Sequence, residues 1–284
     1  MTPKPPPSEG ANSYGSFVLR NRGYIPDDLQ KKILNTRVLL AGCGLGSPIA
    51  EALLRTGFTR LLLVDHDTIA PHNLNRQNFT AADIGRRKVE ALADRLRAIF
   101  PAAEIETMAD RVRLENARAI VERADLILDT IDFLSLPDLV SLHDAARESG
   151  KPLLSCLTAG WGAAALYFPP GNPCTARRLF GLPDRGPVTG ASYVERFAGI
   201  MKALAGRLNP AITAVMAEAL TVMEDGTPCP ASQVAAGGAA VAALAATLAV
   251  RVVGGQPVAV APRIHLVDLD RLAPEGTLTL GGPA

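Results

Sequence analysis

The chain has 284 residues, of which 48% are hydrophobic and 20% are charged, and its formal net charge is +1. This composition is ordinary for a globular protein, and the near-zero charge excludes a general electrostatic attraction to nucleic acid or to an anionic membrane. The four cysteines include no Cys-x-x-Cys pair, which excludes a zinc ribbon and a thioredoxin-like motif.

The N-terminal region divides into a tail and a short helix. Residues 1–13 are rich in proline and polar residues and are predicted to be disordered. A helix is expected to begin near Pro26, because proline suits the first helical turn and two acidic residues follow it. The chain start carries no signal-peptide pattern and the cysteines are scattered, which favours a cytoplasmic protein.

The first strong pattern is a strand, a glycine-rich turn and a helix. The strand is expected at 38–41 and the helix at 48–56. The turn between them holds three glycines: Gly42, Gly44 and Gly46. Such a turn lets the backbone approach a phosphate at the positive end of the helix. A second strand at 61–64 ends at Asp65, whose carboxylate suits ribose hydroxyls. The alternative is a tight turn that binds no ligand.

Strands and helices then alternate as far as residue 156. Further strands are predicted at 103–108, 125–129 and 152–156, and helices at 84–99, 114–122 and 137–149. This alternation indicates a doubly wound, Rossmann-like sheet that is parallel in its first half.

The C-terminal half lacks the regular alternation of strands and helices, and it is expected to extend the same sheet with antiparallel strands. Its predicted elements are a strand at 163–168, a loop at 169–187, helices at 191–206, 210–223 and 231–253, and a last strand at 263–268. Residues 231–250 carry no charge, but they are mostly alanine and glycine. A buried helix therefore explains them better than a membrane span.

Polar and cationic residues gather where a nucleotide's phosphates would lie. Arg76 and Lys88 follow the second strand, with Asn73 and Gln77 as neutral hydrogen-bonding groups, and Asp132 follows a neighbouring strand. Attack of a carboxylate on the α-phosphorus of ATP needs cations and Mg²⁺, because both reactants are anionic. Asp132 would hold the Mg²⁺.

Each of these residues also has an ordinary structural interpretation. Arg76 could form a surface ion pair, Lys88 could be a solvated helix residue, and Asp132 could cap a helix. A nicotinamide-dependent oxidoreductase would account for the glycines and Asp65, but it would leave all three of these residues without a function.

Five stretches together resemble the ThiF/MoeB/HesA family of adenylyltransferases, which are relatives of the ubiquitin-activating enzymes. The stretches are Ala-Gly-Cys-Gly-Leu-Gly-Ser at 41–47, Val-Asp-His-Asp at 64–67, Asn-Leu-Asn-Arg-Gln at 73–77, Asp-Ile-Gly-Arg-Arg-Lys at 83–88 and Asp-Thr-Ile-Asp at 129–132. The resemblance covers residues 20–168 well and the remainder loosely. It implies one adenylation domain over 14–284, with a nucleotide-binding half at 14–160 and a substrate and dimer half at 161–284.

The resemblance also implies an enzyme that uses ATP and Mg²⁺ to convert a carboxylate into an acyl-adenylate. The carboxylate would belong to a small ubiquitin-like carrier protein, a peptide or a small acid, and no membrane partner is expected. An RNA-borne carboxylate is a further alternative: the near-neutral net charge argues against a large RNA surface, but Arg177, Arg178 and Arg185 could cluster. The implied nucleotide-binding residues are Gly42, Gly44, Gly46, Asp65, Asp67, Asn73, Arg76, Gln77 and Lys88. The implied catalytic residues are Arg76, Lys88, the metal ligand Asp132, and an N-terminal arginine that reaches across a homodimer. Arg20 is the first candidate for that arginine and Arg22 the second.

The chain departs from the family pattern in several places. The glycine turn is one residue shorter than the usual fingerprint, and Phe133 stands where many members have asparagine. The zinc-binding cysteine pairs are absent, so we predict no structural zinc. Cys174 and Cys229 lie in predicted loops and are interpreted as incidental rather than as covalent acceptors. A non-catalytic dimeric scaffold of the same fold remains a further alternative.

Overall fold

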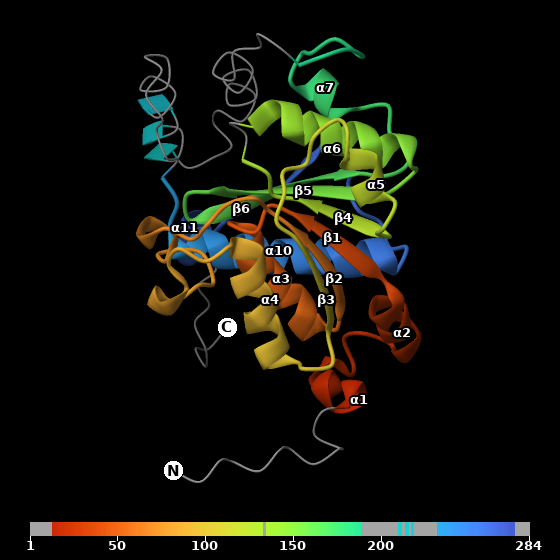
Figure 1. The fold of residues 1–284 in the computed structure, drawn as a ribbon, viewed down its shortest axis with the longest axis vertical. Helices are drawn as coiled ribbons and strands as arrows, with labels where there is room; N and C mark the ends of the chain where they lie inside the picture. The colour runs from red at the N-terminus through yellow and green to blue at the C-terminus, as the bar shows by residue number, and fades with distance from the viewer. Residues whose placement is uncertain are drawn as a thin grey trace, which may run out of the picture.

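The computed structural model describes residues 13–132, 135–188, 210–211, 214–215, 217–218 and 232–275 (Figure 1). In these residues seven strands form one sheet in the order β3-β2-β1-β4-β5-β6-β7. The strands are β1 Arg37–Ala41, β2 Arg60–Val64, β3 Glu104–Met108, β4 Leu126–Asp129, β5 Leu153–Ala159, β6 Gly162–Phe168 and β7 Ile264–Asp268. β1 to β5 pair in parallel, whereas β6 and β7 pair antiparallel. The predicted fold class is confirmed.

Helices cover both faces of the sheet (Figure 1). They are α1 Tyr14–Phe17, α2 Asp27–Asn35, α3 Gly46–Thr56, α4 Lys88–Ile99, α5 Ala117–Val121, α6 Leu136–Glu148, α7 Ala176–Leu179, α10 Ala235–Val253 and α11 Leu269–Glu275, with 3-10 turns η1 Leu19–Asn21, η2 Pro71–Asn73 and η3 Ala81–Asp83. In β1, Leu40 packs in the core with α3, α4 and α10, and Leu39 packs in the core with α5 and α6. The central strand is therefore buried on both sides, as a parallel sheet requires.

Several predicted helix starts were wrong. α5 begins at Ala117 rather than at 114, and α10 begins at Ala235 rather than at 231. α3 begins at Gly46, two residues before the expected start. α4 begins at Lys88 and not near residue 84. The reason is local: Gly85 has a φ of +86°, and Thr68 forms an antiparallel bridge with Arg87, so the chain is extended there rather than helical. This delay places Lys88 in the first turn of α4.

The loop expected at 169–187 contains one element that was not predicted. Thr175 caps the short helix α7 by accepting a hydrogen bond from the backbone N–H of Arg178. The helices predicted at 191–206 and at 210–223 lie wholly or mostly outside the described residues. The N-terminal tail before residue 13, Phe133 and Cys229 lie outside them as well.

The alanine-rich helix α10 is a core element. It is long and apolar enough to cross a membrane by length and composition, but half of that apolar window is buried inside the protein. Two glycines in its first turns permit close packing. A Cβ on Gly237 would lie 2.3 Å from the carbonyl oxygen of Gly160, and a Cβ on Gly238 would lie 3.0 Å from that of Arg76. α10 therefore sits against both the β5–β6 turn and the polar segment that follows β2.

Candidate active site

The glycine turn lies at the carboxyl ends of β1 and β4, between the strand edge and α3. Gly42 has a φ of +93°, and its N–H donates to the carbonyl of Val64 at 2.8 Å. The Thr130 hydroxyl donates to the carbonyl oxygen of Gly42 at 2.6 Å. A Cβ on Gly42 would lie 2.5 Å from the Thr130 carbonyl oxygen, and a Cβ on Gly46 would lie 2.9 Å from Cδ2 of Leu40. Gly42 therefore requires glycine for packing reasons alone, whereas the contact at Gly46 is with the flexible end of a side chain.

Replacing Gly42 with alanine is expected to destabilise the fold more than the same change at Gly85. Both residues have a positive φ, so the backbone strain is common to the two variants. Only Gly42 adds a collision, because nothing lies within 4 Å of a Cβ on Gly85. Gly42→Ala should therefore lower the free energy of unfolding by about 1–3 kcal/mol more than Gly85→Ala, as measured by urea denaturation. Equal losses in the two variants would show that the contact with Thr130 relaxes without cost.

Asp65 braces the glycine turn from the end of β2. It is 8% exposed, and its two oxygens accept the backbone N–H groups of Cys43 at 2.6 Å and Asp67 at 2.7 Å. Burial raises the pKa of the Cys43 thiol well above its usual value; the charge of Asp65 adds to this, and that of Lys88 opposes it. Cys43 is thus a protonated packing residue. The Asp65 carboxylate lies beside the glycine turn, as a residue that binds ribose hydroxyls would have to.

Lys88 reaches the glycine turn from the start of α4. Its side chain is 9% exposed, and Nζ donates to an oxygen of Asp67 at 2.7 Å. A Cβ on Gly44 would lie 3.6 Å from this Nζ and 3.0 Å from Nε2 of Gln77. The missing side chain of Gly44 therefore lets a buried ammonium group and an amide lie close to the glycine turn.

The Asp67 carboxylate is coupled to this ammonium group. Burial alone would raise the pKa of Asp67, but the hydrogen bond and charge of Lys88 outweigh it, so the pKa is lowered. The contact of Asp67 with Lys88 suggests a supporting role for Asp67, which sequence reasoning had assigned to direct nucleotide binding. That assignment stays a prediction.

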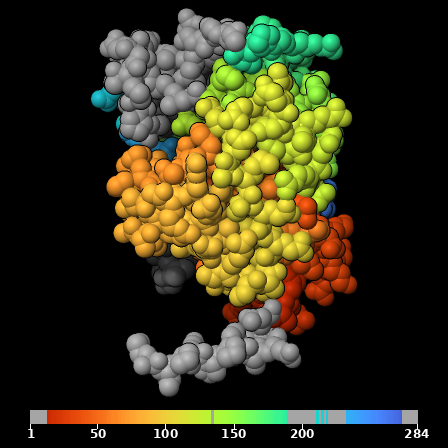
Figure 2. All heavy atoms as spheres, viewed as in Figure 1, coloured from red at the N-terminus to blue at the C-terminus, as the bar shows by residue number. Residues whose placement is uncertain are grey.

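The segment after β2 supplies the other polar groups, and Figure 2 shows part of this stretch of the chain, in orange, at the surface on one side of the molecule. Asn73 is buried in η2, where its side-chain oxygen accepts the N–H of Ala70 at 2.9 Å. Gln77 is 7% exposed, and its Oε1 has no hydrogen-bond partner in the described structure. An orphaned amide oxygen beside the glycine turn fits a site that receives a polar ligand.

Arg76 and Asp132 influence each other on the same rim. Burial lowers the pKa of the Arg76 guanidinium, and the negative charge of Asp132 opposes this change. Asp132 is exposed and follows β4 by three residues, in the loop whose Thr130 holds the glycine turn. The structure thus brings Arg76, Lys88, Asp132 and the glycine turn to one edge of the sheet. Carboxylate oxygen is the ligand type that Mg²⁺ prefers, so Asp132 fits a metal-binding role.

Asp65, His66 and Asp67 also place oxygen and nitrogen atoms within 4.8 Å of one another. Asp65 is occupied by backbone N–H groups, and Asp67 is paired with Lys88. This cluster is therefore a poor second metal site compared with Asp132.

A buried network missed by sequence reasoning fixes the start of the Asp132 loop. Asp129 is 1% exposed, and one of its oxygens accepts the Ser155 hydroxyl at 2.9 Å and lies 2.9 Å from Nε2 of His143. Its other oxygen accepts the N–H of Ile131 at 3.0 Å. Asp129 was visible in sequence as an acid ending an apolar strand. Its partners come from β5 and α6, and their distances from Asp129 along the sequence match no known motif.

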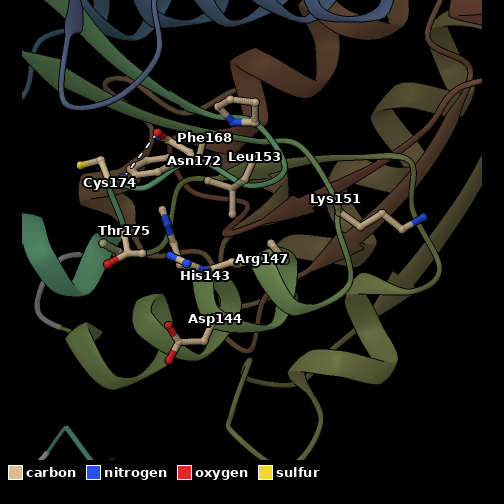
Figure 3. Close-up of a pocket in the computed structure, with 12 residues that line it drawn as sticks. His143, Asp144, Arg147, Lys151, Leu153, Phe168, Asn172, Cys174 and Thr175 are labelled. Carbon is tan, nitrogen blue, oxygen red and sulfur yellow. Dashed lines mark hydrogen bonds between the residues drawn. The ribbon is translucent and has the colours of Figure 1, made fainter. Parts of the chain in front are cut away.

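A small cavity of about 30 Å³ lies beside this network and is lined by His143, Phe168, Asn172 and Cys174, among others (Figure 3). This volume is close to that of one water molecule, so the cavity is too small for a nucleotide. Burial raises the pKa of the Cys174 thiol, and the charge of Arg178 opposes this effect.

Arg20 does not reach the site of its own chain. It is exposed in η1, and its neighbour Asn21 donates to the carbonyl of Thr56 at 2.9 Å, at the last residue of α3. The glycine turn adjoins the first residue of the same helix. An α-helix of 11 residues is about 16 Å long. Arg22, the second candidate, is exposed in the same region.

Comparison with known proteins gives consistent matches. The model of the ThiF family matches residues 18–278. The sulfur carrier protein ThiS adenylyltransferase of Escherichia coli is 30% identical over 215 residues, which cover 69% of this chain and 84% of that protein. The adenylyltransferase and sulfurtransferase MOCS3 of Arabidopsis thaliana is 32% identical over 180 residues, and the SAMP-activating enzyme E1 of Haloferax volcanii is 30% identical over 161 residues. These matches cover 62% and 56% of this chain, but only 38% and 59% of those two proteins.

Solved structures share the fold at low sequence identity. E. coli MccB with ATP superimposes with a TM-score of 0.62 at 18% identity, over 92% of this chain and 73% of MccB. PaaA superimposes with a TM-score of 0.64 at 17% identity, over 95% of this chain and 82% of PaaA.

Proposed function

The chain belongs to the ThiF family, and from this premise we propose that it is an ATP-dependent adenylyltransferase that converts a carboxylate into an acyl-adenylate and releases pyrophosphate. One observation carries the proposal: the buried ammonium group of Lys88 lies close to Gly44, in the glycine turn that precedes α3, and the N-terminus of such a helix attracts anions. A triphosphate seated there would have its charge opposed by Lys88 and Arg76.

The reaction needs stabilisation of charge and little proton transfer. A carboxylate oxygen attacks the α-phosphorus, a new P–O bond forms, and the bond to the β-phosphate oxygen breaks with its electron pair leaving on pyrophosphate. The attacking carboxylate is already ionised at neutral pH, so no general base is required. Lys88 and Arg76 lower the repulsion between the two anions, and Asp65 orients the ribose. Mg²⁺, when bound by Asp132, would neutralise charge on the leaving phosphates.

The substrate class is proposed from the relatives. The E. coli relative is named for adenylating the sulfur carrier protein ThiS, the Haloferax relative for activating SAMP, and MccB has been crystallised with MccA. We propose that the carboxylate of this chain's substrate is the C-terminus of a small carrier protein or a peptide, with a small acid as the alternative.

A nucleic-acid substrate has less support. The three arginines that left an RNA-borne carboxylate open are Arg177, Arg178 and Arg185. Arg177 is 8% exposed and donates to Asp144, to the Pro183 carbonyl and to the Gly186 carbonyl. It therefore holds the chain around α7 and adds nothing to a basic surface that phosphates could reach. We propose a cytoplasmic enzyme without a nucleic-acid partner.

ATP–pyrophosphate exchange separates this proposal from its alternatives. Exchange should depend on Mg²⁺ and on a candidate carboxylate, such as a carrier protein or peptide encoded beside this chain. A nicotinamide-dependent oxidoreductase would bind NAD(H) and exchange nothing, and a scaffold would bind ATP without exchange. Absence of exchange across a panel of such carboxylates, with ATP binding intact, would refute the enzymatic proposal.

We further propose a homodimer in which Arg20 of one subunit completes the site of the other. Chains carrying Arg20→Ala and Asp132→Ala are each expected to be inactive alone. Mixed dimers should recover about half of the wild-type exchange activity, because one of the two sites then has both residues intact. A tagged variant purified with its untagged partner confirms the mixing. Confirmed mixed dimers without recovered activity would contradict the role of Arg20, and the same experiment with Arg22→Ala tests the second candidate.

A further inference from the structure

Gln233 joins the candidate site from the C-terminal half of the chain, 157 residues away from Arg76 in sequence. It lies two residues before Ala235, the first residue of helix α10. Its side-chain Oε1 accepts a hydrogen bond from Nε of Arg76 at 2.5 Å, and its backbone carbonyl accepts Nδ2 of Asn75 at 3.1 Å. No property of the sequence around Gln233 indicated this contact.

Within the described part of the chain, the hydrogen bonds of Arg76 use the Nε and Nη1 donors of its guanidinium group. A guanidinium has five N–H donors in a fixed plane. Nε donates to Gln233, and Nη1 donates to the carbonyl of His72 and to Oδ1 of Asn75, both at 2.9 Å. The two donors on Nη2 make no hydrogen bond to the described residues. Because the plane is rigid, the three bonds from Nε and Nη1 determine where Nη2 points.

The main chain of Arg76 is held from the same direction. A Cβ on Gly238 would lie 3.0 Å from the Arg76 carbonyl oxygen, so the first turn of α10 packs directly against it. The start of α10 therefore fixes both the backbone and the side chain of Arg76, through Gly238 and Gln233.

We propose that Gln233 is a positioning residue that directs the Nη2 group of Arg76 toward the nucleotide phosphates. This inference rests on the proposed function. A small misplacement of a charge-stabilising group costs much of its effect on the rate, so loss of the Gln233 side chain should slow adenylation although it touches no substrate. The proposal also makes the site depend on the placement of the segment that enters α10.

The decisive experiment is a double-mutant cycle between Gln233 and Arg76. Gln233→Ala is expected to lower kcat/KM for ATP–pyrophosphate exchange by about 10-fold, because one hydrogen bond to a charged group is lost. Gln233→Glu keeps an acceptor oxygen at the same place and should retain most of the activity. In an Arg76→Ala background, Gln233→Ala should have no further effect. The matched control is Gln256→Ala, at an exposed glutamine beyond the end of α10, which should behave as the wild type.

Two results would overturn the inference: full activity of Gln233→Ala, or an equal loss in the wild-type and Arg76→Ala backgrounds. Thermal unfolding of each variant separates a folding defect from a positioning defect, and Gln233→Glu remains informative if Gln233→Ala unfolds. If the wild type exchanges no pyrophosphate but binds ATP, only the proposed function fails. The cycle is then measured by calorimetry in the Kd for ATP, and the same two patterns decide it. A wild-type chain that binds no ATP overturns both proposals.

Discussion

Lys88→Ala is expected to lower the rate of ATP–pyrophosphate exchange by about 10²–10³-fold while the protein remains folded. Nζ of Lys88 would lie 3.6 Å from a Cβ on Gly44, and the Lys88 side chain is 9% exposed. A buried cation of this kind opposes phosphate charge far more strongly than a solvated one, because little water screens it. The loss should appear mainly in kcat if Lys88 acts on the charge that develops on the leaving pyrophosphate.

The matched control is Lys31→Ala, at an exposed lysine on α2, which should leave exchange unchanged. Lys88→Arg tests position as well as charge, because the larger guanidinium must share the space in front of Gly44 with Gln77. We expect it to recover only part of the activity. Full activity of Lys88→Ala would show that adenylation does not need Lys88, and this would contradict the basis of the proposed function.

The same variant gives an independent reading on stability. Lys88 lowers the pKa of Asp67 in the folded protein, against the effect of burial. A lowered carboxyl pKa stabilises the fold at pH values above the unfolded pKa of about 3.9, and this contribution is lost as the pH falls through the folded pKa. The difference in unfolding free energy between wild type and Lys88→Ala should therefore be constant near neutral pH and shrink below about pH 4. A difference that grows toward acid would contradict the pairing.

Asp132→Ala is expected to abolish exchange to a similar degree, through the metal rather than through a direct phosphate contact. Asp132 is exposed on the loop that Thr130 ties to Gly42, and its charge acts on Arg76. Asp132→Asn keeps the size of the side chain and removes the charge. It should lose activity by about 10²-fold or more, with a higher Mg²⁺ requirement for the remainder, because a neutral amide is a weaker ligand for a hard cation.

The control for Asp132 is Asp184→Ala, at a side chain that is 74% exposed far along the chain. It should change neither exchange nor its dependence on Mg²⁺. Exchange activity titrated against Mg²⁺ is the measurement. An Asp132→Ala enzyme with wild-type activity at every Mg²⁺ concentration would show that the metal is held elsewhere or is not needed.

Local patterns were sufficient for most of the nucleotide-binding half. Short apolar runs bounded by glycine and polar residues identified β1, β2 and β4, because a buried strand and its turn are defined by residues adjacent in sequence. The start of α4 was misjudged because the amphipathic pattern runs through residues 84–87, whereas Gly85 and the bridge between Thr68 and Arg87 hold them extended. A tertiary contact overrode the periodicity there.

Sequence patterns were enough to predict the alternating α/β order, the glycine turn, and the positions of Lys88, Arg76 and Asp132 after neighbouring strands. Each of these features depends on residues a few positions apart, because local backbone geometry then fixes the direction in which their side chains point. Three features could be found only in the folded structure. Asp129 is hydrogen-bonded to His143 and Ser155, and Gln233 accepts a hydrogen bond from Arg76. Arg20 lies near the C-terminal end of α3, away from the glycine turn of its own chain. These contacts join elements that become neighbours only when the sheet and its helices assemble. The number of residues between the contacting residues depends on loops and helices whose lengths can vary.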